Sequence, residues 1–397
     1  MTTRPDPVSP EWPTRKREDW KHTSTLPAQR TTFEPAKAGA NGLSRDLLTA
    51  WSCNDPAASL VFVNGAFSEG MSRLPEHKGL EVRALAREDA GVVASLDDAP
   101  MVAHNAASWT DGAHITVAKG ALIEAPIEVI FVHTEADRPT ETHTRVQVLA
   151  GEASAITLVE THLGLGAQPA FETTVTEIAV GQAANVKHVR VQRSGDAANH
   201  FGTVLATTGA SSVFESHVVS LGAAISRTAV HVPLQGKGAE CALYGLYAAV
   251  DEQSLDHYTV IDHQVPHCTS QEHYKGVVSD NAVGSFVGRI FMREGAVGSA
   301  TEQMARVLLL SEKARANARP QLEIDNDDVT AAHGTAIGSL DNDALFYLQA
   351  RGLDVETARG LMVQGFVQEQ LDRLPVRELA EALTHEVLSR LHEKEMG

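Results

Sequence analysis

Four stretches that open with glycine decide the fold: GEASAITLVE at Gly151, GQAANVKHVR at Gly181, GASSVFESHV at Gly209 and GKGAECALYG at Gly236. Each begins as a turn and continues into a segment in which apolar and polar residues alternate, as they do along a β-strand. The starts lie 30, 28 and 27 residues apart, and later turns at His267 and Ala296 lie close to the same interval. Repeats of this length are typical of solenoids, propellers and arrays.

The segments around these repeats have the same character. Short runs rich in valine, isoleucine and threonine follow one another from about Ala113, among them HITVAKG, APIEVIFVHTE and THTRVQVLAG. Propeller blades normally carry a Trp-Asp or Gly-Gly signature and more aromatic residues than the 5% found here. We therefore predict a mainly β protein built on a parallel β-helix, with a meandering β-sandwich as the alternative.

Regions of different composition flank the repeats. The N-terminal residues are rich in Pro, Thr, Lys and Arg and contain Trp12 and Trp20, which predicts an extended or loosely helical arm that docks on a surface not identified by the sequence. A region of mixed structure follows, with one short strand in SLVFVNGAF (residues 59–67). We expect three parts: an N-terminal arm and mixed α/β region (1–100), a β-helix core (101–338) and a C-terminal helical region (339–397).

The C-terminal region predicts three helices. Asp341 or Asp343 is a suitable N-cap for the first helix, and Gly352 is a suitable stop. The second helix opens at Asp354 and the third near Pro375. We expect the second helix to bury one face, formed by Ala358, Leu361, Met362, Gly365 and Phe366.

Charge and composition exclude several classes of partner. With 51 acidic and 33 basic residues the formal net charge is −18, and no stretch concentrates positive charge, so we expect no nucleic-acid partner. No apolar run reaches the roughly 18 residues of a membrane span, and no apolar core of a secretion signal opens the chain. We therefore expect no membrane partner and a cytoplasmic location. The cysteines Cys53, Cys241 and Cys268 are too scattered for a disulfide framework, which predicts reduced thiols.

Common catalytic signatures are missing from the sequence. It contains no GxxxxGK[ST] phosphate loop, no GxGxxG after a strand, no GxSxG and no HExxH. Four histidines and Cys268 do crowd into YTVIDHQVPHCTSQEHYKG, namely His257, His263, His267 and His273. Imidazole and thiolate suit zinc, iron or copper. Pro266 prevents the helix that would align two of them, so we favour hydrogen bonding at strand ends over metal binding.

A β-helix enzyme that cleaves polysaccharides is an alternative function. Asp251, Glu252 and Asp256 lie near one another in the sequence and could supply paired carboxylates. Tyrosines nearby could supply platforms for sugar rings. Basic residues that would bind uronate groups are sparse, which makes this alternative the weaker one.

Two motifs in the second half of the chain, ARPQLEIDNDDVTAAHG (residues 318–334) and LFYLQARGL (345–353), follow the pattern of a known family. They resemble KPQLEI, DDV, a cysteine and HG, and then FYLxSRG, in the SufB/SufD family of iron–sulfur cluster assembly proteins. SQEHYKGVVSDNAVGSFVGRIFM (270–292) and EQMARVLLLSEKA (302–314) resemble further family blocks. KREDWKHT (16–23) resembles the arm of the SufD branch, so the likeness extends from about residue 16 to residue 372.

The resemblance has implications for fold and function. It implies a right-handed parallel β-helix between helical ends, and a non-catalytic subunit of a SufBCD-type assembly complex. The branch most similar to the chain is SufD, because SufB members are generally longer and richer in cysteine. A SufD-like subunit pairs with a SufB-like subunit, a transient cluster is built near their interface, and a SufC-like ABC ATPase docks on the C-terminal helical region. Reduced flavin is associated with some such complexes. A purely structural homodimer is a further alternative.

One departure from the family pattern bears on the site. Where the family commonly has cysteine two residues before the histidine, this chain has Ala331, and an alanine methyl cannot bind iron. His333 is then the candidate iron or cluster ligand of this segment, with a hydrogen bond to a backbone carbonyl as its alternative role. The resemblance also implies an ATPase-docking region, for which we take Leu345, Phe346, Tyr347, Arg351, Leu361 and Phe366.

Overall fold

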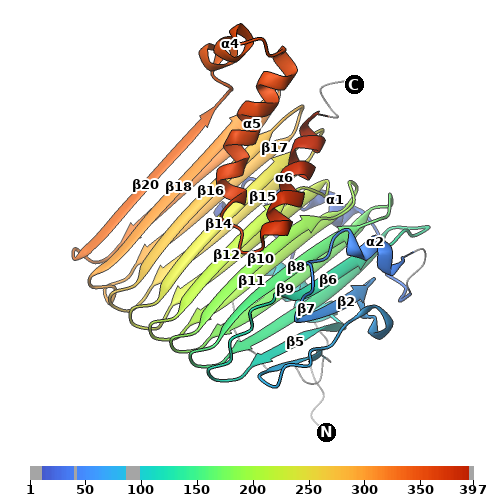
Figure 1. Ribbon diagram of the computed structural model, residues 1–397, viewed down its shortest axis with the longest axis vertical. Coiled ribbons are helices and arrows are strands. Elements are labelled where there is room, and N and C mark those ends of the chain that lie inside the picture. Colours follow the sequence, from blue (N-terminus) through green and yellow to red (C-terminus); the bar gives the residue numbers. More distant parts are fainter. Residues whose placement is uncertain (1–10, 40–42, 86–98, 393–397) are drawn as a thin grey trace.

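The computed structural model describes residues 11–39, 43–85 and 99–392. The first ten residues of the predicted arm, parts of the mixed region and the end of the third predicted helix lie outside this described part. The body is a parallel β-helix of about eight turns, in which the chain alternates between two facing sheets (Figure 1). The predicted fold class is therefore confirmed.

Each of the two sheets has ten strands. The first sheet contains β4 (Leu80–Ala84), β5 (Asp111–Val117), β7 (Thr140–Ala150), β9 (Ala170–Val180), β11 (Asn199–Thr208), β13 (Ile225–Leu234), β15 (Ser254–His263), β17 (Val283–Met292) and β19 (Arg315–Ile324), with β1 (Glu34–Pro35) paired to β7. The second sheet contains β3 (Ala66–Phe67), β2 (Ala58–Val63), β6 (Ile127–His133), β8 (Ala155–Gly164), β10 (Asn185–Arg193), β12 (Val213–Ser220), β14 (Glu240–Ala249), β16 (Thr269–Val278), β18 (Ser299–Leu309) and β20 (Val329–Gly338).

Short helices flank the N-terminal strands, and longer helices follow β20. They are η1 (Glu18–Trp20), α1 (Leu26–Arg30), α2 (Arg45–Thr49), η2 (Glu69–Met71), α3 (Pro100–Ser108), α4 (Asn342–Ala350), α5 (Val355–Leu371) and α6 (Arg377–His392). None of the helices in the described ranges combines the length and the apolar character that a membrane crossing requires.

The predicted repeat corresponds to the turn that carries the chain from the first sheet to the second. In successive coils this turn holds one residue in the left-handed region, with φ between +54° and +70°: Ala153, Ala183, Ser211, Gly238, His267 and Gly298. The repeated glycines allow neighbouring coils to approach closely, because a Cβ on Gly236 would lie 2.0 Å from the carbonyl carbon of Gly209. The spacing read from the sequence is therefore the length of one coil.

The space between the sheets is partly apolar and partly polar. Apolar side chains such as Val186, Phe214 and Ile290 form one continuous core. Elsewhere between the sheets, fully buried Arg190 donates to the Glu160 carboxylate at 2.7 Å. Burial alone would raise the pKa of Glu160, but Arg190 and two neighbouring histidines hold that pKa well below its ordinary value. The charge inside the solenoid is thus paired, as burial requires.

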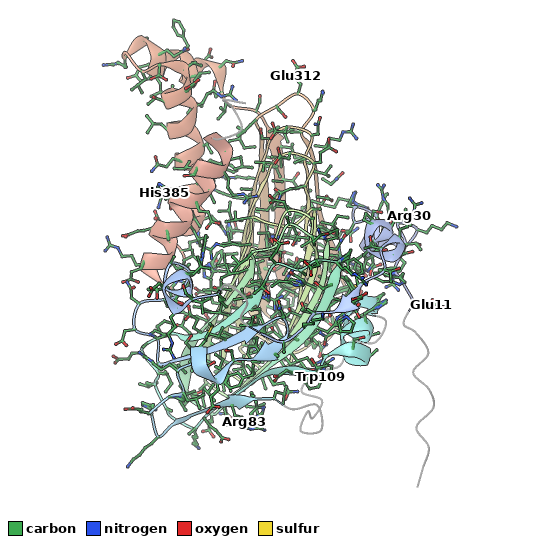
Figure 2. All side chains as sticks on the ribbon, turned by 90° about the vertical axis from the view of Figure 1, so that its right-hand side faces the viewer. Glu11, Arg30, Arg83, Trp109, Glu312 and His385 are labelled. Carbon is green, nitrogen blue, oxygen red and sulfur yellow. The ribbon has the colours of Figure 1, made fainter. Side chains whose placement is uncertain are left out.

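Helices α5 and α6 cover the outer face of the second sheet (Figure 1). Figure 2 shows this helical layer, with His385 on α6, on one side of the sheets and Arg30 of α1 on the opposite side. The predicted N-caps Asp341 and Asp354 are confirmed, since each accepts hydrogen bonds from the first turn of its helix. Because the apolar contacts of α5 and α6 lie on the sheet, these two helices form one body with it.

The expectation about the buried face of α5 was wrong in part. The buried face of α5 contains Val363, Val367 and Leu371 together with Ala358, whereas Leu361 and Gly365 are exposed. Apolar residues lie on several sides of this helix, so periodicity alone does not identify the side that meets the sheet.

The short strand predicted within residues 59–67 is present as β2. The residues after it add a hairpin that was not predicted, because Asn64 and Gly65 both have positive φ and form the two-residue turn between β2 and β3.

The N-terminal arm docks as predicted, and the surface that it covers is the outer face of the first sheet. The ring of Trp20 is buried, and the Arg227 guanidinium lies 4.4 Å from its centroid. The Thr23 hydroxyl donates to the Asp256 carboxylate, which is also paired with Arg227. The arm therefore covers part of a sheet face that would otherwise be exposed.

Candidate functional site

The last coil of the β-helix, formed by β19 and β20, is open. Each of these strands pairs on one side only, with β17 and β18 respectively, and no strand within residues 11–39, 43–85 or 99–392 pairs with the other side. Ile324 at the end of β19 is 47% exposed and Ile337 on β20 is 45% exposed. An uncapped coil thus presents unpaired backbone groups and apolar side chains together, which is the property of a surface that binds another chain.

His333 faces the inside of this open coil. It pairs in register with Gln303 of β18, which is fully buried between the sheets, and side chains in register share one face of a parallel sheet. On β19, Ala318 and Leu322 face the same interior, because they pack against its apolar core. Along these two fully described strands, His333 is the one titratable residue that faces inward: the inward set is Ala316, Ala318, Pro320, Leu322, Ile324, Val329, Ala331, His333, Thr335 and Ile337.

Ala331 lies on the same inward face as His333, two residues before it. A thiol at this position would have shared the open coil with the imidazole. The side chains in register with Ala331 on the preceding strands of the second sheet form a row: Thr301 on β18, Ser270 on β16 and Cys241 on β14. Cys241 is therefore three strands from Ala331, about 14 Å at the usual strand spacing.

The three cysteines are poorly placed to act as ligands at the open coil. All of them are buried, and burial raises the pKa of each thiol, Cys53, Cys241 and Cys268, above its ordinary value. A buried thiol that stays protonated is a poor metal ligand. Among the described residues, no three His, Cys, Asp or Glu side chains converge to hold a metal ion.

The histidine-rich stretch in β15 and β16 forms hydrogen bonds. His257 contacts the Ser220 hydroxyl at 2.8 Å and His263 contacts the Ser270 hydroxyl at 2.9 Å. His267 occupies the left-handed position of its turn, and the thiol of Cys268 donates to the Gly236 carbonyl at 3.4 Å. These contacts show that His257, His263 and Cys268 take part in the internal packing of the solenoid.

The candidate ATPase-docking residues divide into two groups. Phe346 is 72% exposed and Tyr347 is 57% exposed on α4, a helix with no buried residue along its described length. Arg351 donates to the Tyr347 hydroxyl at 2.9 Å, so these two side chains form one exposed unit. Leu345 is half-buried, and Leu361 is exposed on α5.

Phe366 belongs to the second group, because its contacts are with the second sheet. The ammonium of Lys275 on β16 lies 4.6 Å from the centroid of the Phe366 ring and donates to the Phe366 carbonyl at 2.7 Å. The same ammonium pairs with Glu369 at 2.7 Å. Phe366 therefore anchors α5 to the sheet, whereas the tip of α4 is left free.

Sequence reasoning missed two residues behind His333. Gln303 and Glu272 precede it in the same row, one and two strands back, and both are fully buried. They lie 30 and 61 residues before His333, so the repeat interval could have identified them. Burial raises the pKa of Glu272 to about 7, although the neighbouring Thr259 and Gln303 side chains oppose this rise. The nearby titratable groups Cys241 and Tyr274 have pKa values that burial raises, so both stay neutral around pH 7.

The raised pKa of Glu272 predicts a pH-dependent stability. The folded protein favours the protonated acid, so this contribution is fully present below the ordinary pKa of 4.5 and is lost as the pH rises through about 7. Glu272→Gln is uncharged throughout. We expect the free energy of unfolding of this variant, relative to the unsubstituted protein, to rise by roughly 2–3 kcal/mol between pH 5 and pH 8.

Urea denaturation at the two pH values measures this difference. The matched control is Glu302→Gln, which changes an exposed carboxylate on the outer face of β18 and should leave the difference constant to within about 0.5 kcal/mol. An equal response of both variants to pH would contradict the assignment.

Comparison with known proteins identifies the family. The family model "SUF system FeS cluster assembly, SufBD core domain" matches residues 131–366. A SufBD-family iron–sulfur cluster assembly protein of Synechocystis is 28% identical over 388 residues, which cover 92% of this chain and 85% of that protein. The chloroplastic protein ABCI7 of Arabidopsis thaliana is 30% identical over 400 residues, which cover 96% and 83%. The iron–sulfur cluster assembly protein SufD of Escherichia coli is 25% identical over 388 residues, which cover 97% and 90%. The chain belongs to the SufBD family of iron–sulfur cluster assembly proteins.

Proposed function

We propose that this chain is a SufD-like, non-catalytic subunit of a SufBCD-type assembly complex. In this role it pairs with a SufB-like subunit and docks a SufC-like ABC ATPase, and it couples ATP-driven motion to cluster assembly and iron delivery. Family membership and the likeness to a protein named SufD support the proposal. The single observation that carries it is the open last coil with His333 on its inner face.

The open coil fits a partner with the same architecture. Another parallel β-helix could add its own edge strands to β19 and β20 and satisfy their unpaired N–H and C=O groups. Covering Ile324 and Ile337 would also remove apolar surface from water. His333 would then lie at the junction of the two chains. The cluster is the cargo of the complex, and the partner would supply the thiolate ligands that this chain lacks at position 331.

The exposed tip of α4 fits the role of the ATPase-docking element. Phe346 and Tyr347 project from a helix whose side chains are not needed for packing, while Phe366 fixes the following helix to β16. A force applied at α4 would therefore pass through α5 into the second sheet, whose last strand carries His333. ATP-driven closure of an ATPase pair could in this way shift the two subunits at the open coil.

The two alternative functions are a structural homodimer and polysaccharide cleavage. A homodimer would use the same open coil, so only the identity of the second subunit in the complex distinguishes it from the proposed pairing with a SufB-like subunit. The carboxylates considered for polysaccharide cleavage do not support that function. Asp256 is buried and paired with Arg227, and Glu252 accepts a hydrogen bond from Asn281 at an exposed turn.

His333→Ala tests the role of the open coil in cluster assembly. We expect the variant to assemble with both partners, because the imidazole is exposed and lies outside the packed core, and to bind several-fold less iron and sulfide per complex after anaerobic reconstitution. His385→Ala, which removes another exposed histidine on α6, is the matched control and should retain full cluster content. Unchanged iron and sulfide in the His333→Ala complex would remove His333 from the function.

Phe346→Asp combined with Tyr347→Ala tests the docking of the ATPase. We expect the double variant to keep its fold and its SufB-like partner but to lose at least tenfold in affinity for the ATPase, since buried aromatic anchors usually dominate an interface. Leu122→Asp, at an equally exposed apolar position near the other end of the solenoid, is the control. Titration calorimetry with the purified ATPase measures both, and an unchanged affinity of the double variant would exclude α4 as the docking element.

A further inference from the structure

The row that ends at His333 brings three polar side chains together inside the solenoid. Glu272 on β16, Gln303 on β18 and His333 on β20 are direct neighbours in register. In parallel strands, such neighbours are about 4.8 Å apart and stack their side chains on one another. Gln303 therefore lies between the buried carboxylate of Glu272 and the exposed imidazole of His333 in this row.

The amide of Gln303 has a defined orientation. Its Nε2 donates to Glu272 Oε2 at 2.5 Å, so its carbonyl group is turned away from the carboxylate. Gln303 Oε1 is buried and has no hydrogen-bond partner in the described structure. A buried carbonyl without a donor is destabilising, because the hydrogen bonds that it made to water are not replaced. The next side chain in the row on this side is His333, whose ring N–H is a suitable donor.

The opposite sheet leaves room for this pair, and the donor that it offers nearby, the Thr259 hydroxyl, lies beside Glu272. A Cβ on Gly288 of β17 would lie 2.2 Å from Gln303 Nε2 and 2.8 Å from Glu272 Oε2, so only glycine accommodates the two side chains. In the last coil Gly288 is followed by Pro320, which has neither a side-chain donor nor a backbone N–H. His333 is thus the inward-facing donor best placed for the Gln303 carbonyl.

We propose that Gln303, held in orientation by Glu272, is a positioning residue for His333. The Oε1 atom of Gln303 accepts a hydrogen bond from one ring nitrogen of His333 and so fixes the tautomer of the imidazole. The lone pair of the other ring nitrogen is then available to a ligand at the open coil. The second part of this inference rests on the proposed function. Partners of this kind orient metal-binding histidines and increase their basicity. Covering of the open coil by another subunit would exclude water and strengthen the bond.

The tautomer of His333 can be measured in the full-length chain. Long-range proton–nitrogen NMR with labelled histidine distinguishes the two tautomers, and His333→Ala identifies the signals. At pH 8, above the pKa of about 7 of Glu272, we expect one dominant His333 tautomer in the unsubstituted protein. Gln303→Leu should give a mixture of both tautomers, because the acceptor is lost.

An exchange of the two partners separates positioning from packing. In the double variant Glu272→Gln, Gln303→Glu the amide and the carboxylate change places, so an acceptor oxygen again faces His333. We expect this variant to restore the single tautomer, and Glu302→Gln on the outer face of β18 to leave it unchanged. In the reconstituted complex, the Gln303→Leu variant should bind several-fold less iron and sulfide than the unsubstituted protein. The iron and sulfide content should recover in the variant with the exchanged side chains.

The outcomes distinguish this inference from the proposed function. The positioning role of Gln303 is overturned if the unsubstituted protein and Gln303→Leu show the same tautomer mixture, or if the exchanged variant behaves like Gln303→Leu. The proposed function of His333 fails independently if His333→Ala retains full cluster content, whatever the tautomer.

Discussion

Every coil of this β-helix depends on the next coil for its backbone hydrogen bonds. The strands of both sheets pair in parallel register from β5 and β6 onward, so each coil satisfies the N–H and C=O groups of the coil before it. The same constraint cannot be met at the end of the array, where β19 and β20 have no following coil in the described chain. The candidate site therefore arises from the fold itself: in the last coil the backbone groups on one side of each strand are left unpaired, and His333 lies on its inner face.

The helices that follow the last coil connect this open end to the rest of the molecule. The chain leaves β20 into α4, whose aromatic side chains are exposed, and then returns as α5 along the outer face of the second sheet. Lys275 and Phe366 fasten α5 to β16, the strand that also carries Glu272 on its inner face. The outer face of β16 thus holds α5, the helix that follows the proposed docking element, and its inner face carries part of the row behind His333. A motion of α4 has a path to this row through α5 and the second sheet.

Much of the fold could be predicted from the sequence because the repeat leaves a local trace. The turn glycines recur at the length of one coil, and the alternation of valine and threonine marks the strands between them. Features that depend on the packing partner were harder to predict: the buried face of α5 is selected by the sheet, and the hairpin at Asn64 and Gly65 by two residues inside an otherwise uniform run. His333 was found through its sequence motif. Gln303 was missed because its local sequence carries no turn signal, although it lies one repeat interval before His333; the register of the strands places it beside His333.

Amide hydrogen exchange, measured strand by strand in the isolated chain and in complex with a SufB-like partner, tests the central claim that the last coil is the surface the partner covers. In the isolated chain, the account predicts rapid exchange of the amides of β19 and β20 that point away from β17 and β18. In the complex these amides should be protected by at least tenfold, and the exchange rates of β10 and β12 should be unchanged. Equal exchange of β20 in both states, with protection elsewhere on the molecule, would contradict it.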